Sequence, residues 1–377
     1  MKRLVLAGGG HAHVEVLRDF ALAPAQAQIT LVTRAPWLTY SGMVPGVIAG
    51  HYVLDDCSID LARLAARAGA RAVYSEVTRI DTVRREMACA NGTVIGYDVL
   101  SLDVGAAAPL DRVRGAREHA VPMRPLDAMV KRFGAALDRA RRGEVRAITL
   151  VGGGAAGVEL ALAMAHRGLG ELGPAAPHVR VITDAPSIVP EFPPAARARL
   201  LRELRRRGVG VHPSSPVTGI TAETVTTGHG HTFASDAVFW SAGVAAHSWI
   251  AESGFATDPR GFLLVDATLQ STSHPLVFGA GDCATRADGE MPKAGVFAVR
   301  AAPVLAKNLR AALGAGALEP HRTRRRFLAL VATGPKRAVA VWNGFSWTGA
   351  SLWRLKDRID RAFVARYNEI TSAPTRT

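Results

Sequence analysis

Three glycine-rich segments hold the residues of this chain whose types and spacing suit the binding of phosphate. The most regular is Gly152-x-Gly154-x-x-Gly157, which follows an apolar run (147–151) and precedes a helical pattern (157–167). Glycine lets the backbone approach a pyrophosphate with no Cβ in the way, and free N–H groups at a helix N-terminus attract its charge. The spacing predicts a dinucleotide site that includes Ala155 and Ala156, and the alternative is a tight turn that binds nothing.

The first glycine segment follows the apolar run 2–7 and is less regular. Gly8 and Gly10 are present, but His13 stands where a third glycine normally allows a helix to pack closely on its strand. We expect either that the helix is slightly displaced or that His13 points away. His11 and Ala12 complete this predicted site.

The residues that follow each second strand bear on the ribose of a dinucleotide. An acidic residue about 20 positions beyond the turn usually binds the ribose hydroxyls. In the first copy that place reads Thr33-Arg34, and in the second it reads Thr183-Asp184. Asp184 lies one position late, and its negative charge favours NADH over NADPH.

The third segment, 277–282, is a short apolar run that leads into two glycines and a carboxylate. Gly279 and Gly281 permit close approach of a phosphate or sugar chain, and Asp282 is able to accept a hydrogen bond from a ribityl hydroxyl. A helix predicted over about 294–312 aims its N-terminal dipole at whatever binds there.

An internal repeat organises these segments, because strand, glycine turn, helix and strand occur twice in the same order. The stretch 77–80 is echoed by 217–220, and in each copy an aspartate precedes a glycine by seven residues: Asp98 and Gly105, then Asp236 and Gly243. The repeat predicts an α/β fold with two Rossmann-like, three-layer βαβ domains.

Composition limits the remaining possibilities. The 377 residues are 48% hydrophobic and 21% charged, which is typical of a globular protein. The three cysteines, Cys57, Cys89 and Cys283, show no spacing for a disulfide scaffold or a cysteine zinc site, so we predict no metal and a cytoplasmic setting. The apolar run after Lys2 and Arg3 is too short for a signal peptide, and no run approaches the length of a membrane span.

Taken together, the three glycine segments resemble the signatures of the pyridine nucleotide-disulfide oxidoreductase superfamily. The resemblance implies that FAD is held by the first segment with Val77, Gly105, the Gly281-Asp282 pair and Gly295, and that NADH or NADPH is held by the second with Gly243. It implies that the second domain is inserted in the first. We expect an FAD domain over 1–120 and 263–320, an NAD(P)H domain over 121–262, and an α+β extension over 321–377.

Because the three cysteines show no spacing for a redox pair, the chain resembles the branch of type II NADH dehydrogenases within this superfamily. In that branch a quinone is usually the electron acceptor. The segments 11–14, 40–46, 292–295 and 353–361 resemble a flavoprotein group that is often fused in front of selenophosphate synthetase, which suggests an association with selenium. In that resemblance Pro45, with Gly46, lies beside the isoalloxazine ring.

Two residues are predicted to act in catalysis. In type II dehydrogenases the glutamate matching Glu159 faces the gap between nicotinamide and flavin, and the alternative is an ordinary acid in the first turn of a helix. Lys293 is predicted to stabilise negative charge on reduced flavin or to contact the acceptor, and the alternative is a solvated lysine. The stretch 296–301 lacks the glutamines that type II enzymes carry for quinone, which puts quinone in doubt.

The last 57 residues carry twelve Lys/Arg against three acidic residues, within a formal net charge of +14 for the whole chain. Aromatic and basic residues alternate there, which fits peripheral contact with the inner face of an anionic membrane. The alternative is a closing helix that packs inward or against a second subunit in a homodimer. No motif suggests nucleic-acid binding.

These observations support one leading hypothesis, an NAD(P)H oxidoreductase that passes hydride to FAD and electrons on to a quinone or another small acceptor. The first alternative is oxidation of a reduced sulfur or selenium compound, which requires a reactive thiol near the flavin. The second is a flavin-bearing redox sensor or interaction module with slow turnover.

Overall fold

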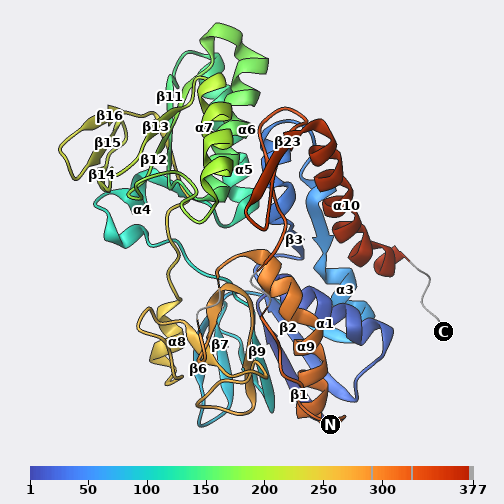
Figure 1. The fold of residues 1–377 in the computed structure, drawn as a ribbon. Coiled ribbons are helices and arrows are strands. Elements are labelled where there is room, and N and C mark those ends of the chain that lie inside the picture. Colours follow the sequence, from blue (N-terminus) through green and yellow to red (C-terminus); the bar gives the residue numbers. More distant parts are fainter. Residues whose placement is uncertain (290–291, 324–325, 373–377) are drawn as a thin grey trace.

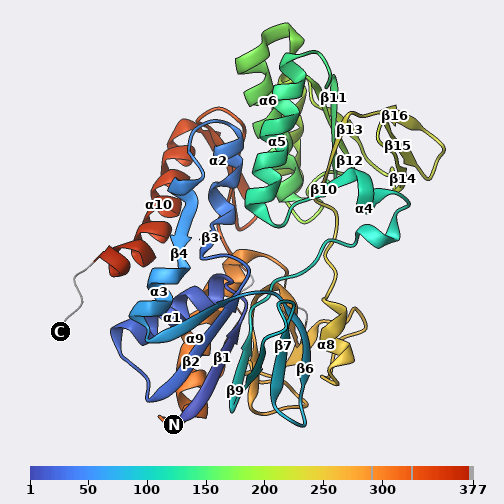
Figure 2. The same ribbon diagram turned by 180° about the vertical axis from the view of Figure 1, so that it is seen from behind.

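The computed structural model describes residues 1–289, 292–323 and 326–372, so the last five residues of the predicted extension lie outside the described residues. Figure 1 and Figure 2 show two lobes with the C-terminal helix along one side of the molecule. Two five-stranded sheets form the centres of these lobes. The chain is therefore α/β with two parallel-sheet units, as the repeat predicts.

The first sheet has the strand order β19-β9-β1-β2-β5, and all its pairings are parallel. Its strands are β1 (Lys2–Ala7), β2 (Ala27–Thr33), β5 (Ala70–Tyr74), β9 (Val99–Leu102) and β19 (Val277–Gly279). Its strands β1, β9 and β19 are mostly apolar and buried, as expected of strands covered on both faces, whereas the edge strand β5 is partly exposed. On one face lie the helices α1 (His11–Leu22), α3 (Leu61–Arg67) and α9 (Gly295–Leu313).

The other face of the first sheet packs on short strands and one helix through a second apolar cluster, which includes Met87, Tyr97 and Trp249. These elements are β6 (Val77–Asp81), β7 (Glu86–Cys89), β8 (Val94–Gly96), β18 (Leu263–Val265), β20 (Ala284–Arg286) and α8 (Ser248–Glu252). The result is a three-layer unit whose sheet is covered on both faces.

The second sheet repeats the plan with the order β10-β17-β11-β12-β13. Its strands are β10 (Ala120–Pro122), β11 (Ala147–Val151), β12 (His178–Ile182), β13 (Gly210–His212) and β17 (Ala237–Trp240). Its helices are α5 (Leu126–Arg141), α6 (Ala155–Leu172) and α7 (Pro194–Arg206), and its small antiparallel sheet is β14 (Val217–Ile220), β15 (Thr224–Thr227) and β16 (Thr232–Ala234).

The duplication extends to irregular detail. The antiparallel pair β6–β7 shifts register between Val77 and Arg79, and β14–β15 shifts register between Val217 and Gly219. The two nucleotide helices begin at His11 and Ala155, two residues before their predicted starts, because Gly10 and Gly154 are extended N-cap residues. The N–H groups of both first turns are thus next to the glycine turns.

Two segments of the chain, which contain Ala107 and Ala245, connect the first unit to the second. Ala107 and Ala245 form an isolated antiparallel bridge, with N–H to O distances of 2.9 and 2.8 Å. The chain enters the second sheet at Ala120 and returns at Leu263. We keep the bounds 1–120, 121–262, 263–320 and 321–377 as a proposal that this strand membership supports.

The C-terminal extension consists of an antiparallel sheet, β21 (Ala329–Ala332), β22 (Ala338–Trp342) and β23 (Phe345–Gly349), followed by α10 (Ala350–Ser372). Val339 packs into the core of the second unit, whereas Trp353 and Tyr367 pack into that of the first. The extension therefore bridges both units, as Figure 1 shows.

The remaining short elements lie between or beside these units: β3 (Trp37–Thr39), α2 (Val44–Ile48), β4 (Ser58–Asp60) and α4 (Ala116–His119). Of these, α2 packs on α6 and so links the first unit to the second. Among the described helices none is both long and apolar enough to span a bilayer.

Candidate active site

The first glycine turn closes around a carboxylate that the sequence analysis did not single out. Asp103 follows β9, is 4% exposed, and accepts hydrogen bonds from the N–H groups of Ala12 (2.8 Å) and His13 (3.1 Å). A Cβ on Gly10 would lie 2.4 Å from this carboxyl group, and so would a Cβ on Gly281. The structure thus brings the first and third predicted segments together around Asp103.

His13 does not point away from its strand, which corrects one of our two expectations. The side chain is fully buried, with Nδ1 2.6 Å from the Gly8 carbonyl oxygen and Nε2 2.8 Å from Ser101 Oγ. Burial lowers the pKa of His13 to about 4. The ring is therefore neutral, and it joins α1 to β1 and β9 through hydrogen bonds where a glycine would have joined them by close contact.

The Gly-Asp segment is held from the second unit. Asp282, at the end of the first sheet, pairs with Arg124 at 2.9 Å, and Gly105 lies beside the same guanidinium group. The side chain of Asp282 is 8% exposed. The arginine thus holds the predicted ribityl-binding carboxylate from the opposite side of the domain junction.

His11 marks the point where three segments converge. A Cβ on Gly295 would lie 3.8 Å from both the His11 ring and Ser41 Oγ, and Tyr40 packs edge-on against that ring. The buried His11 Nε2 has no hydrogen-bond partner among the described residues. Burial lowers the pKa of His11, and the charge of Arg124 lowers it further while Asp103 and Asp282 oppose the shift. An unsatisfied buried nitrogen beside glycines that leave room for a ligand fits a site for a bound molecule such as a flavin dinucleotide.

Residues predicted for the adenosine end lie together at the ends of β2 and β5. Thr33 is buried, and its hydroxyl donates to the Ala35 carbonyl at 3.3 Å. Arg34 is exposed and pairs with Glu76 at 3.5 Å, next to Val77. This group is contiguous with the first glycine turn, since a Cβ on Gly9 would meet Thr33 Oγ1 at 2.7 Å.

The second glycine turn is more open. A Cβ on Gly157 would lie 2.1 Å from the Gly152 carbonyl oxygen, so the third glycine is needed for the helix to sit on its strand. Gly154 faces open space, and Ala156 and Asp184 are exposed. Gly243 has φ +63°, which matches +70° at Gly105 in the first copy. Nothing in this turn blocks a pyrophosphate.

Lys293 is not a freely solvated side chain. Its ammonium group donates to the Ala284 carbonyl and lies 4.0 Å from the centre of the Phe262 ring. Burial lowers the pKa of Lys293. Its predicted role at the flavin stays a prediction, because these contacts turn the ammonium group toward β18 and β20.

Glu159 lies in a cluster of protonatable groups that we call the Glu159 cluster and define as Glu159, Tyr40, Lys356 and Asp360. Asp360 is buried and the other three are partly buried. Lys356 Nζ donates to the Gly42 carbonyl at 2.5 Å and to Asp360 at 2.6 Å, and the Tyr40 hydroxyl donates to Asp360 at 3.3 Å. The Glu159 carboxylate accepts from the backbone N–H of Ala332 at 2.7 Å.

Burial raises the pKa of Glu159 to about 7, although the charge of Lys356 and the hydrogen bond from Ala332 oppose the shift. The pKa of Asp360 is raised by the same cause. The sequence analysis had quoted Lys356 and Asp360 only within a resembling segment. Their i, i+4 spacing was the available signal, but their burial depends on contacts with residues more than 300 positions away.

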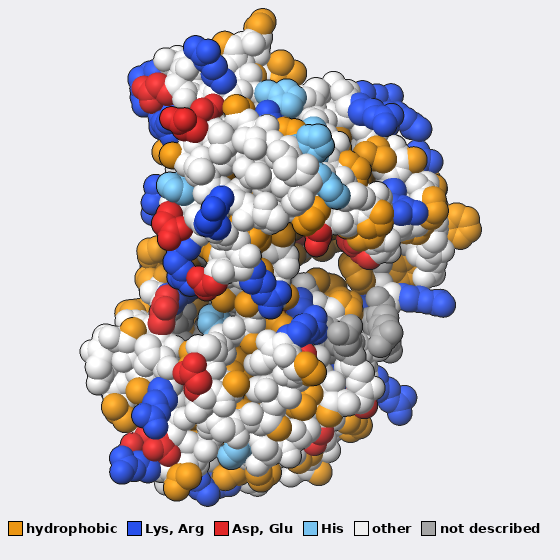
Figure 3. Space-filling model, turned by 90° about the vertical axis from the view of Figure 1, so that its left-hand side faces the viewer, with side chains coloured by type: hydrophobic (Ala, Val, Ile, Leu, Met, Phe, Trp, Pro, Cys, Tyr) orange, Lys and Arg blue, Asp and Glu red, His pale blue; other side chains and the backbone are white. Residues whose placement is uncertain are grey.

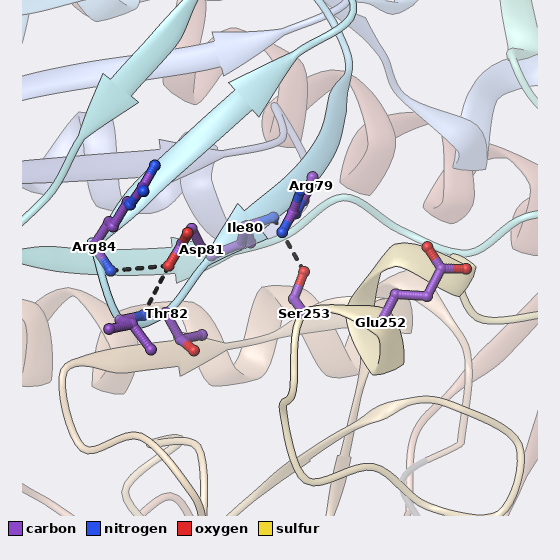
Figure 4. A pocket seen from close by; sticks show the side chains of 8 residues that line it. Arg79, Ile80, Asp81, Thr82, Arg84, Glu252 and Ser253 are labelled. Atoms are coloured by element: carbon purple, nitrogen blue, oxygen red, sulfur yellow. Dashed lines mark hydrogen bonds between the residues drawn. The ribbon is translucent and has the colours of Figure 1, made fainter.

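A separate surface pocket lies between the β6–β7 turn and α8 (Figure 4). Some of its polar groups already have partners: Ile80 N–H donates to Ser253 Oγ at 3.0 Å, and Asp81 accepts from the backbone N–H groups of Val83 and Arg84. None of its lining residues belongs to the glycine turns or to the Glu159 cluster. Figure 3 shows instead a waist between the two lobes, with Lys and Arg side chains mainly below its hollow and Asp and Glu side chains at its upper edge.

Fold and site together define an oxidoreductase with two dinucleotide sites, one of which suits FAD. The family model for pyridine nucleotide-disulphide oxidoreductases matches residues 2–302, and the chain belongs to this family. It is accordingly an FAD-dependent oxidoreductase with a nicotinamide nucleotide as its second dinucleotide.

Relatives of known name place the chain near the NADH dehydrogenases. It is 23% identical over 293 residues to the NADH dehydrogenase-like protein YutJ of Bacillus subtilis, covering 76% of this chain and 77% of that protein. It is 30% identical over 173 residues to the type II NADH:quinone oxidoreductase of Haemophilus influenzae, covering 43% of this chain and 39% of that protein.

Solved structures share the fold at low sequence identity. NDH2 from Plasmodium falciparum in complex with NADH has a TM-score of 0.79 at 14% identity, covering 98% of each chain. The sulfide:quinone oxidoreductase from Aquifex aeolicus also has a TM-score of 0.79, at 16% identity, covering 100% of this chain and 93% of that one.

Proposed function

We propose that the chain oxidises NADH through FAD and passes the electrons to a quinone, an acceptor that takes up protons as it is reduced. The observation that carries this proposal is the Glu159 cluster, in which a partly buried carboxyl group with a pKa of about 7 lies near a lysine and a second carboxyl group. The relative from Haemophilus influenzae, a type II NADH:quinone oxidoreductase, supports the proposal.

Each dinucleotide has its own set of residues in this proposal. The first turn, Asp282 and Gly295 hold FAD, while the second turn, Gly243 and Asp184 hold NADH. FAD supplies the hydride-accepting and electron-passing chemistry when bound. The protein aligns the two ring systems, and α2 and α10 pack against elements of both units beside them.

The proton balance gives the Glu159 cluster its role. Reduction of a quinone by NADH moves two electrons and one proton from the nucleotide and consumes one further proton. Glu159 is close to half-protonated near neutral pH, which suits a group that gives and regains a proton in each cycle. Lys356 and Asp360 fix the charge around it through the 2.6 Å ion pair.

Thiol chemistry has no support from the geometry. Cys57, Cys89 and Cys283 are all buried, and burial raises the pKa of Cys57 and of Cys283 to about 12. Cys283 Sγ points at the carbonyl oxygens of Leu102 and Ala280. A nucleophilic thiolate near neutral pH is therefore not available at these positions.

We also propose peripheral membrane contact through the β22–β23 hairpin, where a hydrophobic acceptor would be found. Trp342, Phe345 and Trp347 are exposed there by 42%, 67% and 51%, and Leu355 and Ile359 are exposed on α10. Large apolar side chains next to basic ones suit a membrane interface.

Anaerobic stopped-flow spectroscopy tests the proposal. Flavin absorbance should bleach rapidly with NADH and more slowly with NADPH, and should return when a short-chain quinone is added. Failure to bleach with either nucleotide in protein that holds FAD would refute the proposal. Bleaching without recovery would refute the quinone alone, and a tight nucleotide complex with negligible turnover would indicate a sensor instead.

A further inference from the structure

We propose that Asp103 couples FAD binding to the uptake of one proton, because its carboxylate occupies the N-terminus of α1 where the FAD pyrophosphate has to bind. The proposal rests on the FAD site described above. It concerns a residue that follows β9, not one of the glycine motifs.

Binding of FAD would bring a second anion to a helix terminus that a carboxylate already occupies. Asp103 Oδ2 already accepts the N–H groups of Ala12 and His13, which belong to the set that the first turn of a nucleotide helix offers to a pyrophosphate. The same carboxyl group lies against Gly10 and Gly281, the two glycines whose missing Cβ atoms give a phosphate room. A phosphate that approaches along either glycine therefore meets the Asp103 carboxyl.

The duplicated unit shows what this position looks like with a neutral residue. A Cβ on Gly8 would meet Asp103 O and Val104 N, and a Cβ on Gly152 would meet Ser241 O and Ala242 N. Ser241 therefore matches Asp103, with a hydroxyl in place of a carboxylate. Only the first of the two turns carries a negative side chain at this place.

Like charges in a site of low dielectric are not both ionised. The groups that face Asp103 are His11 and His13 on α1, and Asp282 and Cys283 beyond β19. The two histidines have lowered pKa values and Cys283 a raised one, whereas Asp282 pairs with Arg124 at 2.9 Å. Among the described residues no Lys or Arg side chain forms an ion pair with Asp103, and burial already raises its pKa to about 6. The added pyrophosphate charge raises it further, so the bound state holds Asp103 neutral and able to donate a hydrogen bond.

Isothermal titration of the apoprotein with FAD, in buffers of different ionisation enthalpy, measures the proton directly. Near pH 7.5 we expect uptake of about one proton per FAD, and above that pH the affinity for FAD should fall about tenfold per pH unit. Asp103→Asn should abolish the uptake and bind FAD more tightly than the wild type at alkaline pH. Asp103→Ser, which copies Ser241, should do the same.

Asp98→Asn is the matched control, because Asp98 lies at the opposite end of β9 and accepts from the Arg3 backbone at 2.7 Å. It should leave the uptake unchanged. Binding of FAD by the wild type without proton uptake would overturn the proposal and leave the flavin site intact, as would an uptake that persists in Asp103→Asn. No binding of FAD at any pH would overturn the flavin site itself. The wild-type measurement decides the question even if the variants fail to fold.

Discussion

Replacement of Glu159 by glutamine should stabilise the protein at neutral and alkaline pH. Burial raises the pKa of Glu159 from an ordinary value of 4.5 to about 7. A difference of about 2.5 pH units corresponds to about 3 kcal/mol of stability, at 1.36 kcal/mol per unit. Glutamine keeps the acceptor for the Ala332 N–H and removes the charge whose burial is unfavourable.

The sign follows from proton binding in the two states. Between about pH 4.5 and pH 7 the folded state binds more protons at Glu159 than the unfolded state, so this contribution to stability declines as pH rises. This contribution of Glu159 to stability is fully present below about pH 4.5 and is lost above about pH 7. Glu159→Gln should remove this slope, so that the difference between variant and wild type grows across the window and levels off near 3 kcal/mol.

Urea unfolding of the holoprotein at several pH values, with the wild type and Glu159→Gln in parallel, measures the difference. Lys356→Met is a useful companion, because loss of the cation should raise the pKa of Glu159 further and move the decline to higher pH. A difference between Glu159→Gln and the wild type that is constant with pH would refute the assignment of a raised pKa to this carboxyl group.

Three further predictions concern the cofactor site, the thiols and the surface. Gly157→Val should retain FAD, but the rate of flavin reduction by NADH should fall at least tenfold, because its Cβ would lie 2.1 Å from the Gly152 carbonyl oxygen. Stopped-flow reduction measures this rate, and the flavin content of the variant is the control. Cys283→Ser should leave steady-state turnover within about twofold of wild type, because the buried thiol has a raised pKa; a large loss of turnover with FAD retained would revive the sulfur or selenium hypothesis. Phe345→Ser combined with Trp347→Ser should weaken flotation of the protein with anionic vesicles, because both side chains are exposed. Flavin reduction by NADH should not change. Equal flotation of variant and wild type would contradict membrane contact by the hairpin.

Most of the fold could be predicted from local sequence. The strand 2–7 and the strand 147–151 have the predicted bounds, and the glycine turns fall between strand and helix as expected. The helix starts were wrong by two residues, because the N-cap glycines lie closer to the helix than hydrophobic periodicity indicates. The inward packing of His13 was harder to predict, since its partner Ser101 is 88 residues away.

Some features of the candidate site could likewise be predicted from the sequence, and others depend on the tertiary structure. The sequence by itself determined two βαβ units and their phosphate turns, because glycine spacing and apolar periodicity are properties of a few neighbouring residues. Only the tertiary structure decided that Asp103 fills the first turn and that Lys356 and Asp360 surround Glu159. Their burial depends on the packing of distant segments, and burial, not residue type, sets whether such groups are charged.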